Sequence, residues 1–120
     1  MIRIMLMIVV LVTSLATLNL YAMSTGEMKV PGEIKVHRFA TDESSIFSNA
    51  YIIELDNSLA VIDATLTVSA SKALRQKVDS LKKPLAAVFI THGHPDHYNG
   101  LGYLTEGKEV PIYSTQAVFD

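Results

Sequence analysis

The sequence contains no cysteine, which excludes a disulfide framework, a thiolate nucleophile and a cysteine-based metal knuckle. Charge is also scarce. Charged residues make up 18% of the chain, and 12 acidic against 10 basic residues give a net charge of -2. A basic face for binding nucleic acid is not indicated, so we expect no nucleic-acid partner. Apolar residues make up 49%, which excludes the profile of a disordered chain.

The first 22 residues differ from the rest of the chain. Arg3 precedes an unbroken apolar run over residues 4–12, and small and polar residues follow up to Ala22. This order is typical of a secretory signal peptide that is cleaved after Ala22. The alternative is an uncleaved membrane anchor, but the strict run has about half of the roughly 20 apolar residues that span a bilayer. We therefore expect an exported protein, periplasmic or secreted, with no stable membrane insertion after cleavage.

Residues 23–120 have the pattern of one small mixed domain. The spacing of Ala70, Leu74, Val78 and Leu81 predicts an amphipathic helix. A second helical stretch is predicted over residues 96–104. Apolar runs and alternating patterns predict strands over residues 34–39, 49–55, 59–64, 85–91 and 110–115. Strands followed by a strand–helix–strand unit predict the α/β (α+β) class, with a mixed sheet and at least one helical crossover.

The most unusual stretch, THGHPDHYNG, follows the fourth predicted strand. Of the four histidines in the chain, His92, His94 and His97 fall within six positions, with Asp96 among them. Residues two apart on an extended backbone point the same way, so His92 and His94 present their imidazoles to one point. Pro95 hinders further extension, which lets Asp96 and His97 turn back over the same space. The fourth histidine, His37, has an ordinary structural explanation on a strand.

These four side chains are the kinds of ligand that zinc takes. The two nitrogens of His92 and His94 form one pair, and the oxygen of Asp96 and the nitrogen of His97 form another. Two such pairs suit two adjacent metal ions better than one. The alternative is a cluster that packs without metal, but such a cluster would be poorly solvated and costly to charge.

The segment HGHPDH, after an apolar strand and Thr91, resembles the HxHxDH signature of the metallo-β-lactamase superfamily. Upstream, NAYIIEL followed by LAVIDAT resembles that family's strand pair with its IDTG-type segment, although Ala64 and Thr65 follow Asp63 here. The resemblance covers roughly residues 34–120. It implies an αββα sandwich, two face-to-face sheets with helices outside, of which this chain holds the N-terminal half.

The resemblance also implies roles for single residues. His92 and His94 would bind a first zinc, and Asp96 and His97 a second, with iron as a possible replacement. Asp96 would in addition be catalytic, because it would orient the nucleophile and take part in proton transfer. Asp63 has two interpretations: an aspartate that supports the metal loop from behind, or a residue that forms the turn at a strand end.

The implied activity is zinc-dependent hydrolysis of a small molecule, in which a metal-bound hydroxide attacks an ester, lactone, thioester or β-lactam carbonyl. Members of the family complete the site from their second half, whereas no histidine follows His97 here. Two protein ligands per metal are too few for a catalytic site. We therefore expect an incomplete domain, inactive by itself. Alternatives are a non-catalytic metal- or partner-binding protein and an iron-dependent oxidoreductase on the same scaffold. The sequence does not set the oligomeric state.

Overall fold

A computed structural model describes residues 32–119. The chain divides into two units, residues 1–30 and 31–120, and the described residues belong to the second. The predicted signal peptide, residues 1–22, lies outside the described residues and stays a prediction. Over the described range, none of the helices combines the length and the apolar character that crossing a bilayer requires.

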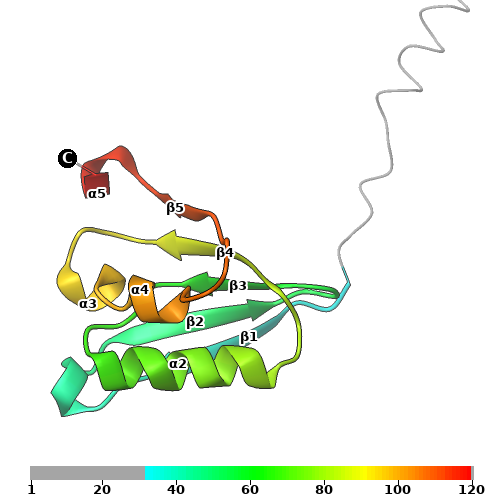
Figure 1. The fold of residues 1–120 in the computed structure, drawn as a ribbon, viewed down its shortest axis with the longest axis horizontal. Helices are drawn as coiled ribbons and strands as arrows, with labels where there is room; N and C mark the ends of the chain where they lie inside the picture. Colours follow the sequence, from blue (N-terminus) through cyan, green and yellow to red (C-terminus); the bar gives the residue numbers. More distant parts are fainter. Residues whose placement is uncertain (1–31, 120) are drawn as a thin grey trace, which may run out of the picture. The chain divides into compact units, whose positions relative to one another are not determined.

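A five-stranded sheet forms the centre of the described unit (Figure 1). β1, β2 and β3 pair antiparallel, whereas β4 and β5 continue the sheet in parallel with β3. The mixed sheet confirms the predicted α/β class, and each strand end lies within two residues of its predicted position. In sheet order, the strands are β1 (Lys35–Ala40), β2 (Asn49–Glu54), β3 (Leu59–Ile62), β4 (Leu85–Ile90) and β5 (Ile112–Ser114).

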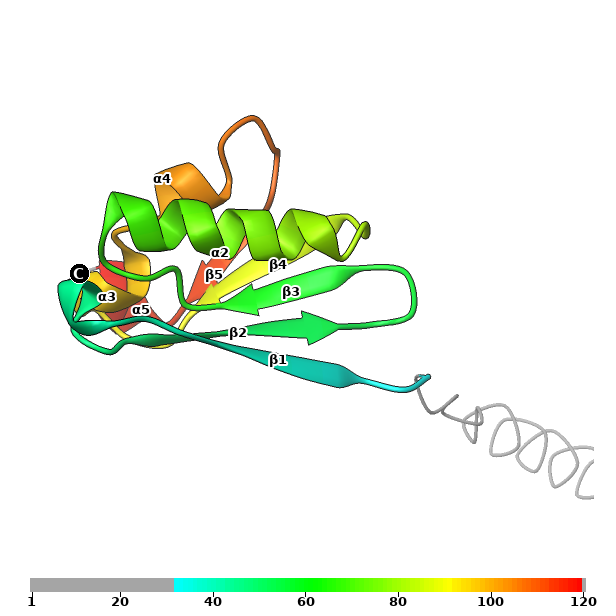
Figure 2. The same ribbon diagram turned by 90° about the horizontal axis from the view of Figure 1, so that it is seen from below.

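Helix α2 (Val68–Ser80) is the predicted crossover between β3 and β4. It begins after Thr67, whose hydroxyl accepts a hydrogen bond from the backbone N–H of Ala70 at 3.3 Å and so caps the helix. Leu74 and Val78 on its inner face are fully buried. Figure 2 shows α2 and α4 (Leu101–Leu104) on the same face of the sheet. The main core lies between this helical layer and the sheet.

The opposite face of the sheet is apolar and exposed. Val36 and Tyr113 keep 61% and 52% of their surface accessible, and the rings of Phe89 and Tyr113 stack with centroids 5.3 Å apart. Within residues 32–119 no second layer buries these side chains. The predicted αββα sandwich would place its second sheet on this face, so the described residues form one sheet with its helices.

The predicted helical stretch 96–104 is two short helices, α3 (Pro95–Tyr98) and α4, which meet at Gly100. The backbone N–H of Gly100 donates to the carbonyl of Thr65 at 3.1 Å. A Cβ at Gly100 would overlap the carbonyl oxygen of Ala64 and the hydroxyl of Ser71. The chain therefore breaks its helix where it touches the segment after β3. Two further short elements are the 3-10 helix η1 (Glu43–Ser45) and α5 (Gln116–Phe119).

Candidate metal centre

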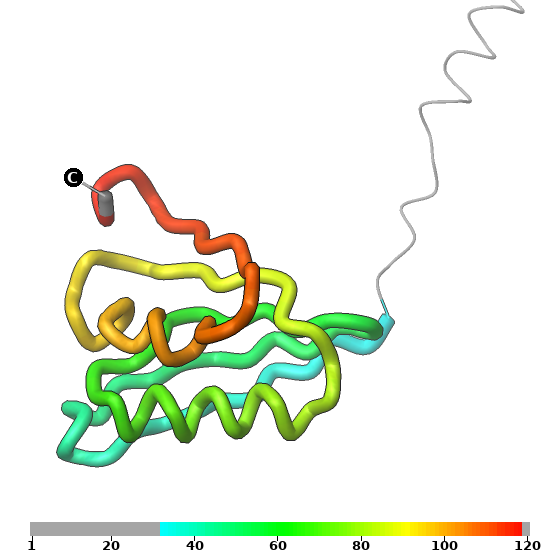
Figure 3. Tube along the Cα trace, viewed as in Figure 1, coloured from blue at the N-terminus to red at the C-terminus, as the bar shows by residue number. Residues whose placement is uncertain are grey.

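The histidine loop, residues 91–97, lies at the edge of the sheet where the parallel strands β3 and β4 end. Figure 3 shows the chain turning back after β4, so that α3 comes to this edge. The backbone N–H of Ala64, just after β3, donates to the carbonyl of His97 at 2.7 Å. This hydrogen bond connects the histidine loop to the turn that follows β3.

The four predicted ligands come together as two pairs. Nε2 of His92 lies 3.2 Å from Nδ1 of His94, and both residues are exposed. Nε2 of His97 lies 3.1 Å from Oδ2 of Asp96, and these side chains keep 19% and 18% of their surface accessible. The His92 and His97 rings are 3.9 Å apart between centroids, so the two pairs are neighbours.

The buried carboxylate of Asp63 holds the histidine loop by hydrogen bonds. Its carboxylate, only 6% exposed, accepts hydrogen bonds from Nδ1 of His97 at 2.7 Å and from the backbone N–H of Thr91 at 2.9 Å. Its backbone is left-handed, with φ of 65°, a conformation that aspartate tolerates better than most residues. Asp63 therefore fits both interpretations from the sequence: it is the turn residue after β3, and its carboxylate contacts the histidine loop.

Two polar residues in this region were not assigned a role from the sequence. The hydroxyl of Thr91 lies 2.9 Å from Nδ1 of His92 and within 3.0 Å of both carboxylate oxygens of Asp63. The side-chain amide of Asn99 donates to the carbonyl of Leu66 at 2.9 Å. In the sequence, a role for Thr91 is indicated only by its position at a strand end beside the motif. The hydrogen bond between Asn99 and Leu66 joins distant segments, so it cannot be predicted without the fold.

His37 is separate from this cluster. Its Nε2 lies 2.7 Å from Oε2 of Glu54, and Nζ of Lys83 binds the other carboxylate oxygen at 2.8 Å. The hydrogen bond from Lys83, followed by that from His37, lowers the pKa of Glu54 from 4.5 to about 2. His37 thus has a local structural partner, as the sequence interpretation expected.

The donor atoms of the two pairs fit zinc. Ligands at 2.0–2.1 Å from one tetrahedral zinc are separated by about 3.3 Å, and the two pairs measure 3.2 and 3.1 Å. Among residues 32–119, no group of three or more His, Asp or Glu side chains is arranged to hold one ion. The described part of the chain therefore places two candidate ligands at each of two positions, short of the three protein ligands usual at a catalytic zinc.

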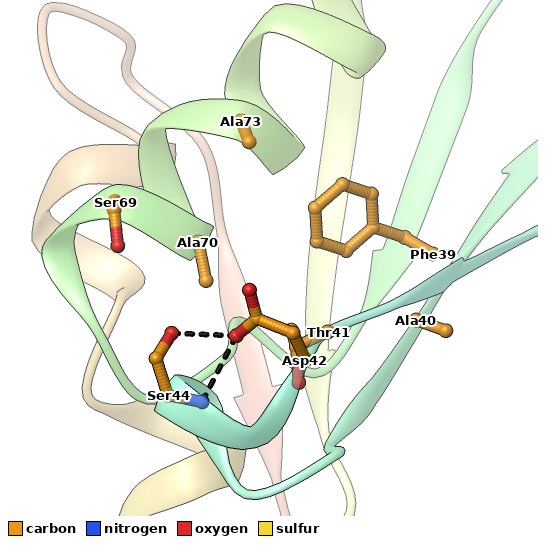
Figure 4. Close-up of a pocket in the computed structure, with 8 residues that line it drawn as sticks. All are labelled: Phe39, Ala40, Thr41, Asp42, Ser44, Ser69, Ala70 and Ala73. Atoms are coloured by element: carbon orange, nitrogen blue, oxygen red, sulfur yellow. Dashed lines mark hydrogen bonds between the residues drawn. The ribbon is translucent and has the colours of Figure 1, made fainter.

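A cavity of about 350 Å³ lies apart from the histidine loop, between the end of β1, η1 and the start of α2 (Figure 4). Its one carboxylate, Asp42, accepts hydrogen bonds from the backbone N–H and the hydroxyl of Ser44 at 3.0 and 2.5 Å. These bonds lower the pKa of Asp42 and occupy Oδ1 in capping η1. The lining residues are Phe39, Ala40, Thr41, Asp42, Ser44, Ser69, Ala70 and Ala73.

Several known proteins resemble this chain in sequence. Ribonuclease J2 of Bacillus subtilis (strain 168) is 31% identical over 83 residues, which cover 59% of this chain and 14% of that protein. Exodeoxyribonuclease YycJ of Bacillus anthracis is 26% identical over 82 residues, covering 68% of this chain and 31% of that protein. The chain thus spans less than a third of the length of these curated relatives.

The fold has relatives among solved structures. The DIM-1 metallo-β-lactamase exposed to ceftazidime superposes with a TM-score of 0.56 at 18% identity, over 75% of this chain and 42% of that one. For TMB-1 the TM-score is 0.53 at 23% identity, over 72% of this chain and 44% of that one. At this level of identity the likeness shows the fold alone. Residues 46–119, more than half of the chain, match the family model described as the metallo-beta-lactamase superfamily. The chain therefore belongs to the metallo-β-lactamase superfamily.

Proposed function

We propose that the histidine loop holds zinc and that the protein is a zinc-dependent hydrolase to which this chain contributes half of the metal ligands. The observation that carries the proposal is the convergence of two donor pairs, at 3.2 and 3.1 Å, on one edge of the sheet. Membership of the family supports a hydrolase in the broad sense. Because the chain spans only part of its relatives' length, the activity of the whole protein belongs to the proposal.

In this proposal, Nε2 of His92 and Nδ1 of His94 would hold the first ion, and Nε2 of His97 and Oδ2 of Asp96 would hold the second. When bound, zinc lowers the pKa of a coordinated water to about 7 and polarises the substrate oxygen. The carboxylate of Asp96 would in addition orient the nucleophile and take part in proton transfer. Asp63 holds His97 by Nδ1, which leaves Nε2 directed at the metal position.

For the substrate, we propose a small molecule with an ester, lactone, thioester or β-lactam carbonyl. A second candidate is a nucleic-acid phosphodiester, because two relatives are named as a ribonuclease and an exodeoxyribonuclease. The expectation of no nucleic-acid partner therefore has no support from the relatives. It was drawn from a net charge of -2, and net charge does not report the charge around one site. Both reactions need the same metal pair, so the assay has to compare them.

The test is hydrolysis by the polypeptide isolated from its native cell, after its intact mass and metal content have been recorded. A chromogenic β-lactam, an aryl ester, a thioester and a labelled RNA represent the candidate substrates. Asp96→Ala should abolish turnover with the fold retained, whereas Asp56→Ala, the same loss of charge in the exposed turn after β2, should leave it unchanged. Turnover that survives in Asp96→Ala would remove its catalytic role. Bound iron with a visible chromophore would favour the oxidoreductase instead.

A further inference from the structure

We infer that Thr91 is a positioning residue that links Asp63 to His92, so that one buried carboxylate orients a histidine in each donor pair. The inference rests on the proposed zinc site and gives a role there to a residue that is not itself a metal ligand. It follows from the hydrogen-bonding capacity of three groups that lie in a row: the carboxylate of Asp63, the hydroxyl of Thr91 and Nδ1 of His92.

The direction of each hydrogen bond in this row is determined by the groups themselves. An ionised carboxylate only accepts, and a threonine hydroxyl has one proton to donate. The Thr91 hydroxyl lies 3.0 Å from Oδ1 and 2.9 Å from Oδ2 of Asp63, so its proton goes to that carboxylate. At 2.9 Å from Nδ1 of His92, the same oxygen is left to accept. His92 must then carry its proton on Nδ1.

A proton on Nδ1 leaves the lone pair of His92 on Nε2, the atom that faces His94 at 3.2 Å. His97 is fixed in the same sense, because Asp63 takes its Nδ1 directly at 2.7 Å and leaves Nε2 facing Asp96. In both histidines Nδ1 is thus held by the protein, and Nε2 is the ring atom turned toward the proposed metal. Asp63 acts on one donor pair directly and on the other through Thr91.

The position of Thr91 makes this a specific role. Its backbone N–H also donates to Oδ1 of Asp63 at 2.9 Å, which holds the hydroxyl in register with the carboxylate. Without the hydroxyl, the carboxylate of Asp63 still accepts hydrogen bonds from the backbone N–H of Thr91 and from Nδ1 of His97, so it keeps partners in the folded state. Removal of the hydroxyl should therefore change the orientation of His92 much more than the stability of the domain.

Two substitutions separate the hydroxyl from the rest of the side chain. Thr91→Val keeps the branched shape and removes the hydroxyl, while Thr91→Ser keeps the hydroxyl. In the metal-free full chain at about pH 8, where free imidazole is neutral, long-range ¹H–¹⁵N correlation spectra report which ring nitrogen carries the proton. We expect His92 protonated on Nδ1 in the wild type and in Thr91→Ser, and redistributed toward Nε2 in Thr91→Val. His97 should be unchanged in all three.

Zinc affinity, measured by competition with a chromophoric chelator, gives the second readout. Loss of a group that orients a metal ligand costs about 10- to 100-fold in affinity, so Thr91→Val should bind zinc at least about tenfold more weakly and Thr91→Ser like the wild type. Asp63→Asn should disturb the protonation of both His92 and His97.

The two readouts keep this inference apart from the proposed function. An unchanged His92 proton position in Thr91→Val would overturn the role of Thr91, even if zinc binds well. Absence of zinc binding in every variant would sink the proposed function, while the ring-proton measurement on the metal-free chain would still decide the inference.

Discussion

Substitution of Gly100 by alanine tests the close contact between the end of the α3 segment and the turn after β3, which positions the histidine loop. A Cβ at this position would overlap the carbonyl oxygen of Ala64 and the hydroxyl of Ser71, and Cβ of Ser71 would lie only 2.9 Å away. Neither neighbour can withdraw, because one is backbone and Ser71 is fully buried. Overpacking of this kind costs about 1–3 kcal/mol. Loss of the 3.1 Å bond from Gly100 to Thr65 adds about 1 kcal/mol.

We therefore expect Gly100→Ala to lower the free energy of unfolding of the full chain by about 3 kcal/mol, or the melting temperature by more than about 10 °C. Gly102 is the matched control. It lies two residues further on in α4, and a Cβ there meets no atom within 4 Å. Gly102→Ala should leave stability unchanged or raise it by up to about 1 kcal/mol, since alanine favours a helix over glycine.

Urea unfolding followed by circular dichroism measures both variants. Equal stability of Gly100→Ala and the wild type would refute the close contact between the α3–α4 junction and the segment after β3. A loss in Gly102→Ala as large as that in Gly100→Ala would show that glycine is needed in α4 for another reason.

Two further predictions concern regions away from the metal loop. The folded-state pKa of Glu54 is about 2 against an ordinary 4.5, so its stabilising contribution is present above pH 4.5 and is lost as the pH falls toward 2. Acid titration of the unfolding free energy should show this loss in the wild type and a flatter profile in Glu54→Gln; equal profiles would contradict the ion pair with Lys83. Ile46 has φ of 50° and is 59% exposed. Thermal melts of Ile46→Gly should show a gain of up to about 1 kcal/mol, whereas Val36→Gly in β1 should lose stability; a loss in both would argue against strain at Ile46.

The strands and the crossover helix could be predicted because their signals are local. Leu74 and Val78 recur at helical spacing and are buried on the inner face of α2, and the continuous run before Thr91 is a parallel strand, β4. The family could also be recognised, because His92, His94, Asp96 and His97 stand at characteristic spacings within six residues.

Other features depend on contacts between distant segments. The break of the 96–104 stretch at Gly100 arises from its approach to Ala64, 36 positions earlier. The sequence left two interpretations of Asp63 open, because only the fold brings its carboxylate against His97. The hydrogen bonds of Thr91 needed the same knowledge. Residues 46 and 47 have left-handed backbones without glycine, and no local pattern indicates them.

In the proposed site, the imidazoles of the histidine loop bind zinc. Zinc X-ray absorption spectroscopy on the zinc-loaded full chain measures these ligands, with the double variant His92→Ala/His94→Ala as the site variant and His37→Ala as the control. We expect a nitrogen and oxygen shell at about 2.0–2.1 Å with imidazole outer-shell scattering, reduced in the site variant and unchanged in the control. Zinc bound without imidazole scattering, or with equal imidazole scattering in the wild type and the site variant, would show that the histidine loop is not the zinc site.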